Sequence, residues 1–148
     1  MPESATQVDV IRTFDAPREA VFAAFTDPEQ VTRWWGPEHF EIPRGSVNID
    51  LRPGGRYDLT MVQTDSGQEY PVRQEILEVS SPELLVLRHE AMPDFGLIAP
   101  IDTRVEFHDE NGATRVQVTS GPYSAHMGPN AQTGWEQQFD KLAGLLSA

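Results

Sequence analysis

The sequence predicts an α+β fold in which a curved antiparallel sheet wraps around a long C-terminal helix, with two short helices after the first strand. Apolar residues alternate with polar ones in successive segments through the middle of the chain, and no helical segment separates these strands. This order favours antiparallel pairing. The last 20 or so residues carry apolar side chains at helical spacing. That helix is the only long apolar element available to fill the concave side of the sheet.

The N-terminal segment predicts one strand and two helices. Residues 7–14 alternate as a strand does. Asp15 is expected to cap a first helix, with Pro17 in its first turn and apolar residues at helical spacing, Val21, Phe22 and Phe25. Asp27-Pro28 breaks that helix and starts a second one, which carries Val31, Trp34 and Trp35 and ends at Gly36-Pro37.

The middle of the chain predicts a run of strands joined by short turns. Val47, Ile49 and Leu51 share one face, and the turn 52–55 leads to a strand with Tyr57, Leu59 and Met61 facing inward. The expected remaining elements are a strand over 69–79, a strand over 84–90, a loop over 92–100, a hairpin of 101–108 and 113–120 around Asn111-Gly112, an irregular stretch over 122–129, and a helix over 130–146.

Composition limits the classes of function. The 148 residues suit a single domain, residues 1–148. The chain has no cysteine, which excludes disulfides, thiolate metal sites and a cysteine nucleophile. Its 11 basic and 23 acidic side chains give a net charge of −12, which excludes nucleic acid and anionic membranes as favourable partners. The polar N-terminus and the lack of a long apolar stretch predict neither a signal peptide nor a membrane span, so a cytoplasmic location is expected.

Several short motifs stand in a fixed order along the chain: Asp15-Ala16-Pro17, Trp34-Trp35-Gly36-Pro37, Asp50 to Gly55, Thr114-Arg115, and Gly134-Trp135 before a leucine-bearing helix. Over residues 8–146 the chain thereby resembles SRPBCC (START/Bet v 1-like) domains, in the branch related to the activator of the 90-kDa heat-shock protein ATPase. The resemblance implies the helix-grip fold, with a cavity between sheet and helix. One position departs from the pattern: Gln74 stands where such domains often have glycine.

The functions of this superfamily are diverse, and a shared fold gives shape rather than reaction. Some relatives bind lipids, hormones or polyketides, some are cyclases or hydratases, and the eukaryotic namesake stimulates a chaperone ATPase. The resemblance therefore implies three alternatives: a domain that binds a small hydrophobic molecule, a cyclase- or hydratase-like enzyme, and a module that interacts with a chaperone. We rank the binding domain first. The sequence does not indicate the oligomeric state.

The residues expected to line the cavity combine apolar surface with a few polar groups, as ligand sites do. Strand parity directs one set toward the long helix: Tyr57, Met61, Tyr70, Gln74, Leu87 and His89. Trp35 and Phe40 could form the lip of a ligand mouth, and Trp135 and Phe139 could form its floor. The alternative for the polar residues is a core in which they satisfy one another, and the alternative for the aromatic residues is packing.

Other chemistries lack a motif. The four histidines, His39, His89, His108 and His126, are too widely spaced to indicate a metal site. The chain has no Gly-x-Ser-x-Gly motif, so a serine nucleophile is not indicated. It also has no phosphate-binding loop, and no cofactor is expected. Acid–base catalysis by His89 with Tyr57 or Tyr70 stays open. On the final helix, Trp135, Phe139, Leu142 and Leu146 form the core stripe, and Gln137, Gln138 and Lys141 are expected to face water.

Overall fold

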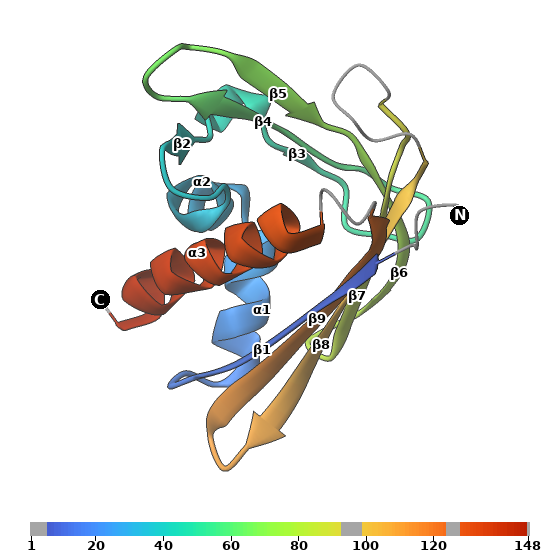
Figure 1. Ribbon diagram of the computed structural model, residues 1–148. Helices are drawn as coiled ribbons and strands as arrows, with labels where there is room; N and C mark the ends of the chain where they lie inside the picture. The colour runs from blue at the N-terminus through green and yellow to red at the C-terminus, as the bar shows by residue number, and fades with distance from the viewer. Residues whose placement is uncertain (1–5, 93–98, 124–127, 148) are drawn as a thin grey trace.

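A computed structural model describes residues 6–92, 99–123 and 128–147 of the chain (Figure 1). The predicted α+β fold class is confirmed. The elements in chain order are β1 (Thr6–Phe14), α1 (Arg18–Thr26), α2 (Pro28–Trp34), β2 (Phe40–Glu41), the 3-10 turn η1 (Arg44–Ser46), β3 (Asn48–Ile49), β4 (Tyr57–Gln63), β5 (Glu69–Val72), β6 (Gln74–Ser80), β7 (Leu84–His89), β8 (Ile101–Glu110), β9 (Ala113–Tyr123) and α3 (Gly128–Ser147).

The strands form two antiparallel sheets. The larger sheet has the order β1-β9-β8-β7-β6, so the first strand pairs with the last one and β6 to β9 form a meander. The smaller sheet has the order β2-β4-β3, and β5 pairs with β4. Backbone hydrogen bonds from Gly54 to Ile76 and from Ile76 to Gly55 join the two sheets at one end. In Figure 1, the two sheets diverge from this joint and enclose the space that α3 occupies.

The predicted single strand over 69–79 is wrong, because the chain changes sheets at Arg73. Residues before it pair with β4 and residues after it pair with β7. Two side chains replace regular ladder partners at this corner. The imidazole Nε2 of His89 accepts from the backbone N–H of Arg73 at 3.3 Å, and the carboxylate of Asp58 accepts from the backbone N–H of Gln74 at 2.9 Å.

Other sequence predictions are corrected at element ends. Asp15 does not cap α1, because Pro17 holds the cap position and makes no side-chain hydrogen bond. Asp27 does cap α2, accepting from the backbone N–H of Glu29 at 3.1 Å. Leu51 lies beyond β3 and is exposed. Of the stretch predicted to be irregular, residues 122–123 extend β9 and residues 128–129 begin α3; residues 124–127, and 93–98 of the predicted loop, lie outside the described residues.

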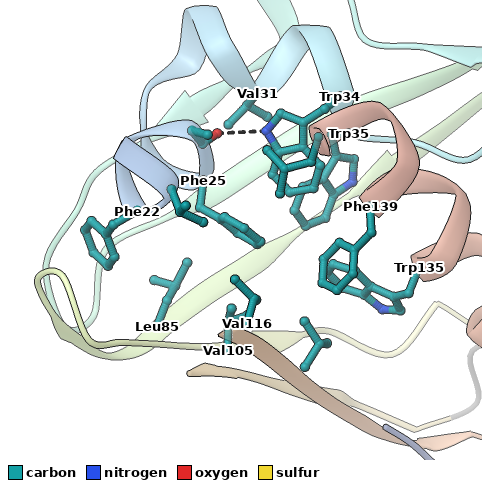
Figure 2. Packing of buried hydrophobic residues seen from close by; sticks show 14 of the residues in the cluster. Phe22, Phe25, Val31, Trp34, Trp35, Leu85, Val105, Val116, Trp135 and Phe139 are labelled. Atoms are coloured by element: carbon teal, nitrogen blue, oxygen red, sulfur yellow. Dashed lines mark hydrogen bonds between the residues drawn. The ribbon is translucent and has the colours of Figure 1, made fainter. Parts of the chain in front are cut away.

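α1 fills one end of the groove between the sheets and α3. Phe22 and Phe25 of α1 meet Phe107 of β8 edge-on, with ring centroids 5.2 Å apart in each pair. Trp34 packs on Phe25, and its indole N–H donates to the carbonyl of Ala24 at 2.8 Å. Figure 2 shows Phe22, Phe25 and Trp34 above the side chains of the large sheet, Leu85, Val105 and Val116. Trp34 therefore serves to pack the core, which is the usual role of a buried aromatic residue.

α3 fills the middle of the groove with its predicted apolar stripe. Phe139 and Leu142 are fully buried, and Phe139 meets Phe14 of β1 edge-on at 5.4 Å. The helix contacts β1 on one side and α2 on the other, as Figure 1 shows. Trp135, in the N-terminal half of α3, faces the part of the groove that α1 does not fill.

Candidate functional site

A partly enclosed cavity of about 310 Å³ lies between the N-terminal half of α3, the large sheet and the β4–β5 hairpin. Its volume falls at the lower end of the range for small-molecule sites, roughly 300–1,000 Å³. The described residues that line it are Trp35, Pro37, Met61, Tyr70, Pro71, Val72, Gln74, His89, Met92, Ile101, Thr103, Tyr123, Asn130, Ala131, Gly134, Trp135 and Gln138.

The cavity exists because α1 covers the inward side chains of the strands at one end of the groove and leaves those at the other end uncovered. On β8, Val105 and Phe107 are covered by α1, whereas Ile101 and Thr103, nearer the other end, face the cavity. β7 follows the same rule, since its inward residues at 85 and 87 are buried core and His89 reaches the cavity. The empty part of the groove is therefore the part beyond the reach of α1.

Six of the ten residues predicted to bind a ligand line the cavity, in the order Trp35, Met61, Tyr70, Gln74, His89 and Trp135. The indole rings of Trp35 and Trp135 meet edge-on with centroids 5.6 Å apart. They form an apolar wall that joins α2 to α3.

The structure places the other four predicted residues outside the lining. Leu87 of β7 and Phe139 of α3 are buried core residues. Phe40 is not among the lining residues and packs edge-on against Tyr70, with ring centroids 5.7 Å apart. Tyr57 is fully buried, and its hydroxyl donates to the carbonyl of Phe25. Burial raises the pKa of Tyr57 far above its ordinary value of 10.0, so the phenol stays neutral.

His89 is held by two backbone groups. Its Nδ1 lies 2.7 Å from the carbonyl oxygen of Glu90, and its Nε2 accepts from the backbone N–H of Arg73. A carbonyl can only accept and an amide N–H can only donate, so these contacts fit a neutral imidazole protonated on Nδ1. Both ring nitrogens are thereby occupied, and the geometry gives His89 no free nitrogen for acid–base exchange with a guest.

Gln74 lines the cavity from the β6 side. The residue is buried, and its amide Nε2 donates to the backbone carbonyl of Tyr57 at 3.3 Å. Among the described residues no hydrogen-bond partner is found for its Oε1. The side chain thus links the two sheets and adds an amide oxygen to the cavity wall.

Three hydroxyl groups at the inner wall were not predicted from the sequence. Thr103 and Ser120 are directly paired across β8 and β9, and their hydroxyl oxygens are 2.8 Å apart. The Ser120 hydroxyl lies 2.9 Å from that of Tyr123, which also accepts from the indole of Trp135. We call Thr103, Ser120 and Tyr123 the hydroxyl relay. The signal for the relay in the sequence was Thr103, a threonine on a strand face whose other inward residues are apolar.

The rim of the cavity is a loop that α3 holds in place. Gly36 has φ of +91°, a conformation that favours glycine, and its backbone N–H donates to Oε1 of Gln138 at 2.7 Å. The ammonium of Lys141 donates to the carbonyls of Gly36 and Pro37 at 2.8 and 3.3 Å. Its partial burial lowers the pKa of Lys141. The prediction that Gln138 faces water is therefore wrong, because this side chain is buried against the loop.

No group of acidic and histidine side chains in the described part of the chain is arranged to hold a metal ion. Across the same residues, none of the helices has the length and apolar content needed to cross a membrane.

Comparison with known proteins fits this geometry. Residues 15–147 match the model of the family described as Activator of Hsp90 ATPase homolog 1-like protein. The chain belongs to this family. Activator-like domains of this kind form a branch of the SRPBCC superfamily, so the predicted family and helix-grip fold are confirmed.

Solved structures of similar domains superpose over nearly the whole chain. A protein from Chromobacterium violaceum is 24% identical with a TM-score of 0.87, covering 96% of this chain and 97% of its own. An AHSA1 protein from Silicibacter pomeroyi is 24% identical with a TM-score of 0.83, covering 96% and 98%. The AHSA1-like protein from Aeromonas hydrophila is 22% identical with a TM-score of 0.78, covering 93% and 90%. A search among curated proteins gave no match.

Proposed function

We propose that this activator-like domain binds a small hydrophobic molecule in the cavity between the large sheet and α3. The observation that supports the proposal is an unfilled space of about 310 Å³ in a domain whose remaining groove is packed with aromatic side chains. Apolar walls with a few oriented polar groups are the usual design of a small-molecule site. The volume lies at the lower end of the range for small-molecule sites, which suits a compact ligand.

The enzymatic alternative has less support. It required His89 to act with Tyr57 or Tyr70, but the hydroxyl of Tyr57 is buried outside the cavity and both nitrogens of His89 contact the backbone. The chaperone-binding alternative expects an exposed apolar patch or an acidic docking face. Among the described residues the exposed large apolar side chains are Ile11, on β1, and Leu51, in the loop after β3. Binding therefore remains the first proposal.

A cavity-filling substitution on α3 tests the proposal. Ala131 lines the cavity, so Ala131→Phe places an aromatic ring where the ligand would lie. Thr133→Phe adds the same ring at an exposed position of the same helix and serves as the matched control. A ligand that binds only the folded state raises stability, by about 2.7 kcal/mol at 100 times its dissociation constant.

The measurement is the thermal shift with neutral compounds such as naphthalene, 2-acetonaphthone and 1-decanol. We expect at least one compound to raise the Tm of the wild type and of Thr133→Phe by several degrees, and to leave Ala131→Phe unchanged. Equal shifts in all three proteins, or no shift in the wild type with any compound, would contradict binding in this cavity.

A further inference from the structure

The hydroxyl relay carries one more proton than its internal contacts can use. Thr103, Ser120 and Tyr123 bring three O–H groups, and two oxygen–oxygen contacts of 2.8 and 2.9 Å connect them. Each contact uses one proton. The indole N–H of Trp135 cannot take up the third, because indole is a donor only. One O–H proton of the relay is therefore free to bind an acceptor elsewhere.

The free proton belongs to an end of the relay that faces the cavity. Ser120 is fully buried and does not line the cavity, and an unpaired buried O–H costs about 1–3 kcal/mol. Thr103 and Tyr123 both line it. For these two hydroxyls the described residues supply no contacts beyond those of the relay and of Trp135. The hydrogen bonds of the relay can run from Thr103 to Tyr123 or the reverse. In either case the hydroxyl with the free proton is at an end of the relay that lines the cavity.

Two considerations assign the spare donor to Tyr123 when an acceptor is present. A phenol is a stronger donor than an aliphatic hydroxyl, and hydrogen bonds that run in one direction polarise one another. The order Thr103 to Ser120 to Tyr123 therefore ends in the stronger donor. Desolvation also raises the pKa of Tyr123, which keeps the phenol protonated.

The charge of the lining restricts the ligand further. No aspartate, glutamate, lysine or arginine occurs among the described residues that line the cavity. An ion buried there would lack a counter-ion, and the cost of burying an unpaired charge is large. The net charge of −12 opposes anions in particular. The remaining wall is mainly aromatic and aliphatic, with Trp35, Met61 and Ile101 among its members.

We infer that the cavity takes a neutral, largely apolar carbonyl compound whose oxygen accepts a hydrogen bond from the hydroxyl of Tyr123. This inference rests on the proposed binding function and adds the chemical class of the ligand and the residue that anchors it. Tyr123 is a specificity-determining residue in this account, since it distinguishes a carbonyl from an apolar group of the same shape.

Three probes of matched shape test the inference by calorimetric titration. 2-Acetonaphthone offers the carbonyl, 2-isopropenylnaphthalene replaces its oxygen with a CH₂ group, and 2-naphthoate replaces the acetyl group with a charged carboxylate. One well-formed hydrogen bond in the cavity gives the ketone an affinity about tenfold above that of the alkene. The naphthoate is expected to bind at least tenfold more weakly than the ketone.

Tyr123→Phe should reduce the preference for ketone over alkene from about tenfold to near one, while the affinity for the alkene stays within about twofold. Retained alkene binding shows that the variant keeps a folded cavity. Tyr70→Phe makes the same chemical change at another tyrosine of the lining, and Thr103→Val shortens the relay without touching the phenol. Both controls should keep most of the preference.

The outcomes separate the inference from the proposed function. Equal binding of ketone and alkene by the wild type, or a preference that survives Tyr123→Phe and is lost in Thr103→Val or Tyr70→Phe, would overturn the assignment of Tyr123 and leave binding in the cavity intact. Naphthoate binding as tight as ketone binding would overturn the neutral ligand class. If neither ketone nor alkene binds the wild type, the proposed function itself fails for these compounds.

Discussion

Tyr57 and Tyr123 show how the burial of a hydroxyl group decides its role. Both pKa values are raised by desolvation. The hydroxyl of Tyr57 donates to the carbonyl of Phe25, near the end of α1, and so helps to satisfy a helix terminus that has no intrahelical partner. The hydroxyl of Tyr123 belongs to the relay at the cavity wall. We therefore expect substitution of Tyr57 to affect stability and substitution of Tyr123 to affect specificity.

Tyr57→Phe should lower the free energy of unfolding by about 1–3 kcal/mol, because it leaves the Phe25 carbonyl buried without its partner. Urea denaturation measures the change, and Tyr70→Phe, at a half-buried position, should cost less. Ligand affinity should not change in Tyr57→Phe. A variant as stable as the wild type would show that the Tyr57 hydroxyl does not support α1.

The same residue gives a pH dependence of stability. The pKa of Tyr57 is raised in the folded state above its ordinary value of 10.0, so its contribution is complete below pH 10 and is lost as the pH rises further. In that range the group lowers the free energy of unfolding by about 1.4 kcal/mol per pH unit. Tyr57→Phe should show a shallower alkaline decline than the wild type.

At the scale of elements, α3 both covers the cavity and fixes its rim. Gln137 and Gln138 are neighbours that accept from backbone N–H groups of the same loop, at Glu38 and Gly36, over 3.0 and 2.7 Å. They differ in burial, because the Gly36 contact is buried and the Glu38 contact is exposed. Water can replace only the exposed contact.

This difference predicts the cost of truncating each glutamine. Gln138→Ala leaves the N–H of Gly36 buried and unpaired, and should lower the free energy of unfolding by about 1–3 kcal/mol. Gln137→Ala should stay within about 0.5 kcal/mol of the wild type. Urea denaturation of the two variants side by side makes the comparison. Equal effects would mean that α3 does not hold the rim through Gln138.

The sequence predicted most elements and about a third of the described residues that line the cavity, and the rest depends on contacts between residues remote in sequence. The β8–β9 hairpin, the Asp27-Pro28 helix start and the stripe on α3 follow from local patterns and are confirmed. The change of sheet at Arg73 depends on side chains of Asp58 and His89, which are remote in sequence. No local pattern could reveal it.

The missed site residues have a similar cause. Strand parity correctly turned Gln74 and His89 toward α3, but parity alone does not say which inward positions α1 covers. Leu87 and Tyr57 were therefore placed in the site although they belong to the packed core. Tyr123 was missed because the predicted strand ended at residue 120, and β9 continues to residue 123.

At the scale of the whole molecule, two helices of unequal reach divide one groove into a packed part and an open part. α1 places Phe22 and Phe25 against β8 at one end, while α3 runs the length of the groove and covers both parts. The packed part supplies stability through aromatic burial. The open part can remain unfilled because the core does not depend on it.

Methyl NMR with labelled methionine and isoleucine side chains tests this division most directly. The wild type is titrated with 2-acetonaphthone, whose ring shifts the resonances of methyl groups beside it. Met61, Met92 and Ile101 line the cavity, whereas Ile11 is exposed on β1. We expect saturable shifts for the three cavity methyl groups and none for Ile11. Saturable binding that leaves Met61, Met92 and Ile101 unshifted would contradict it.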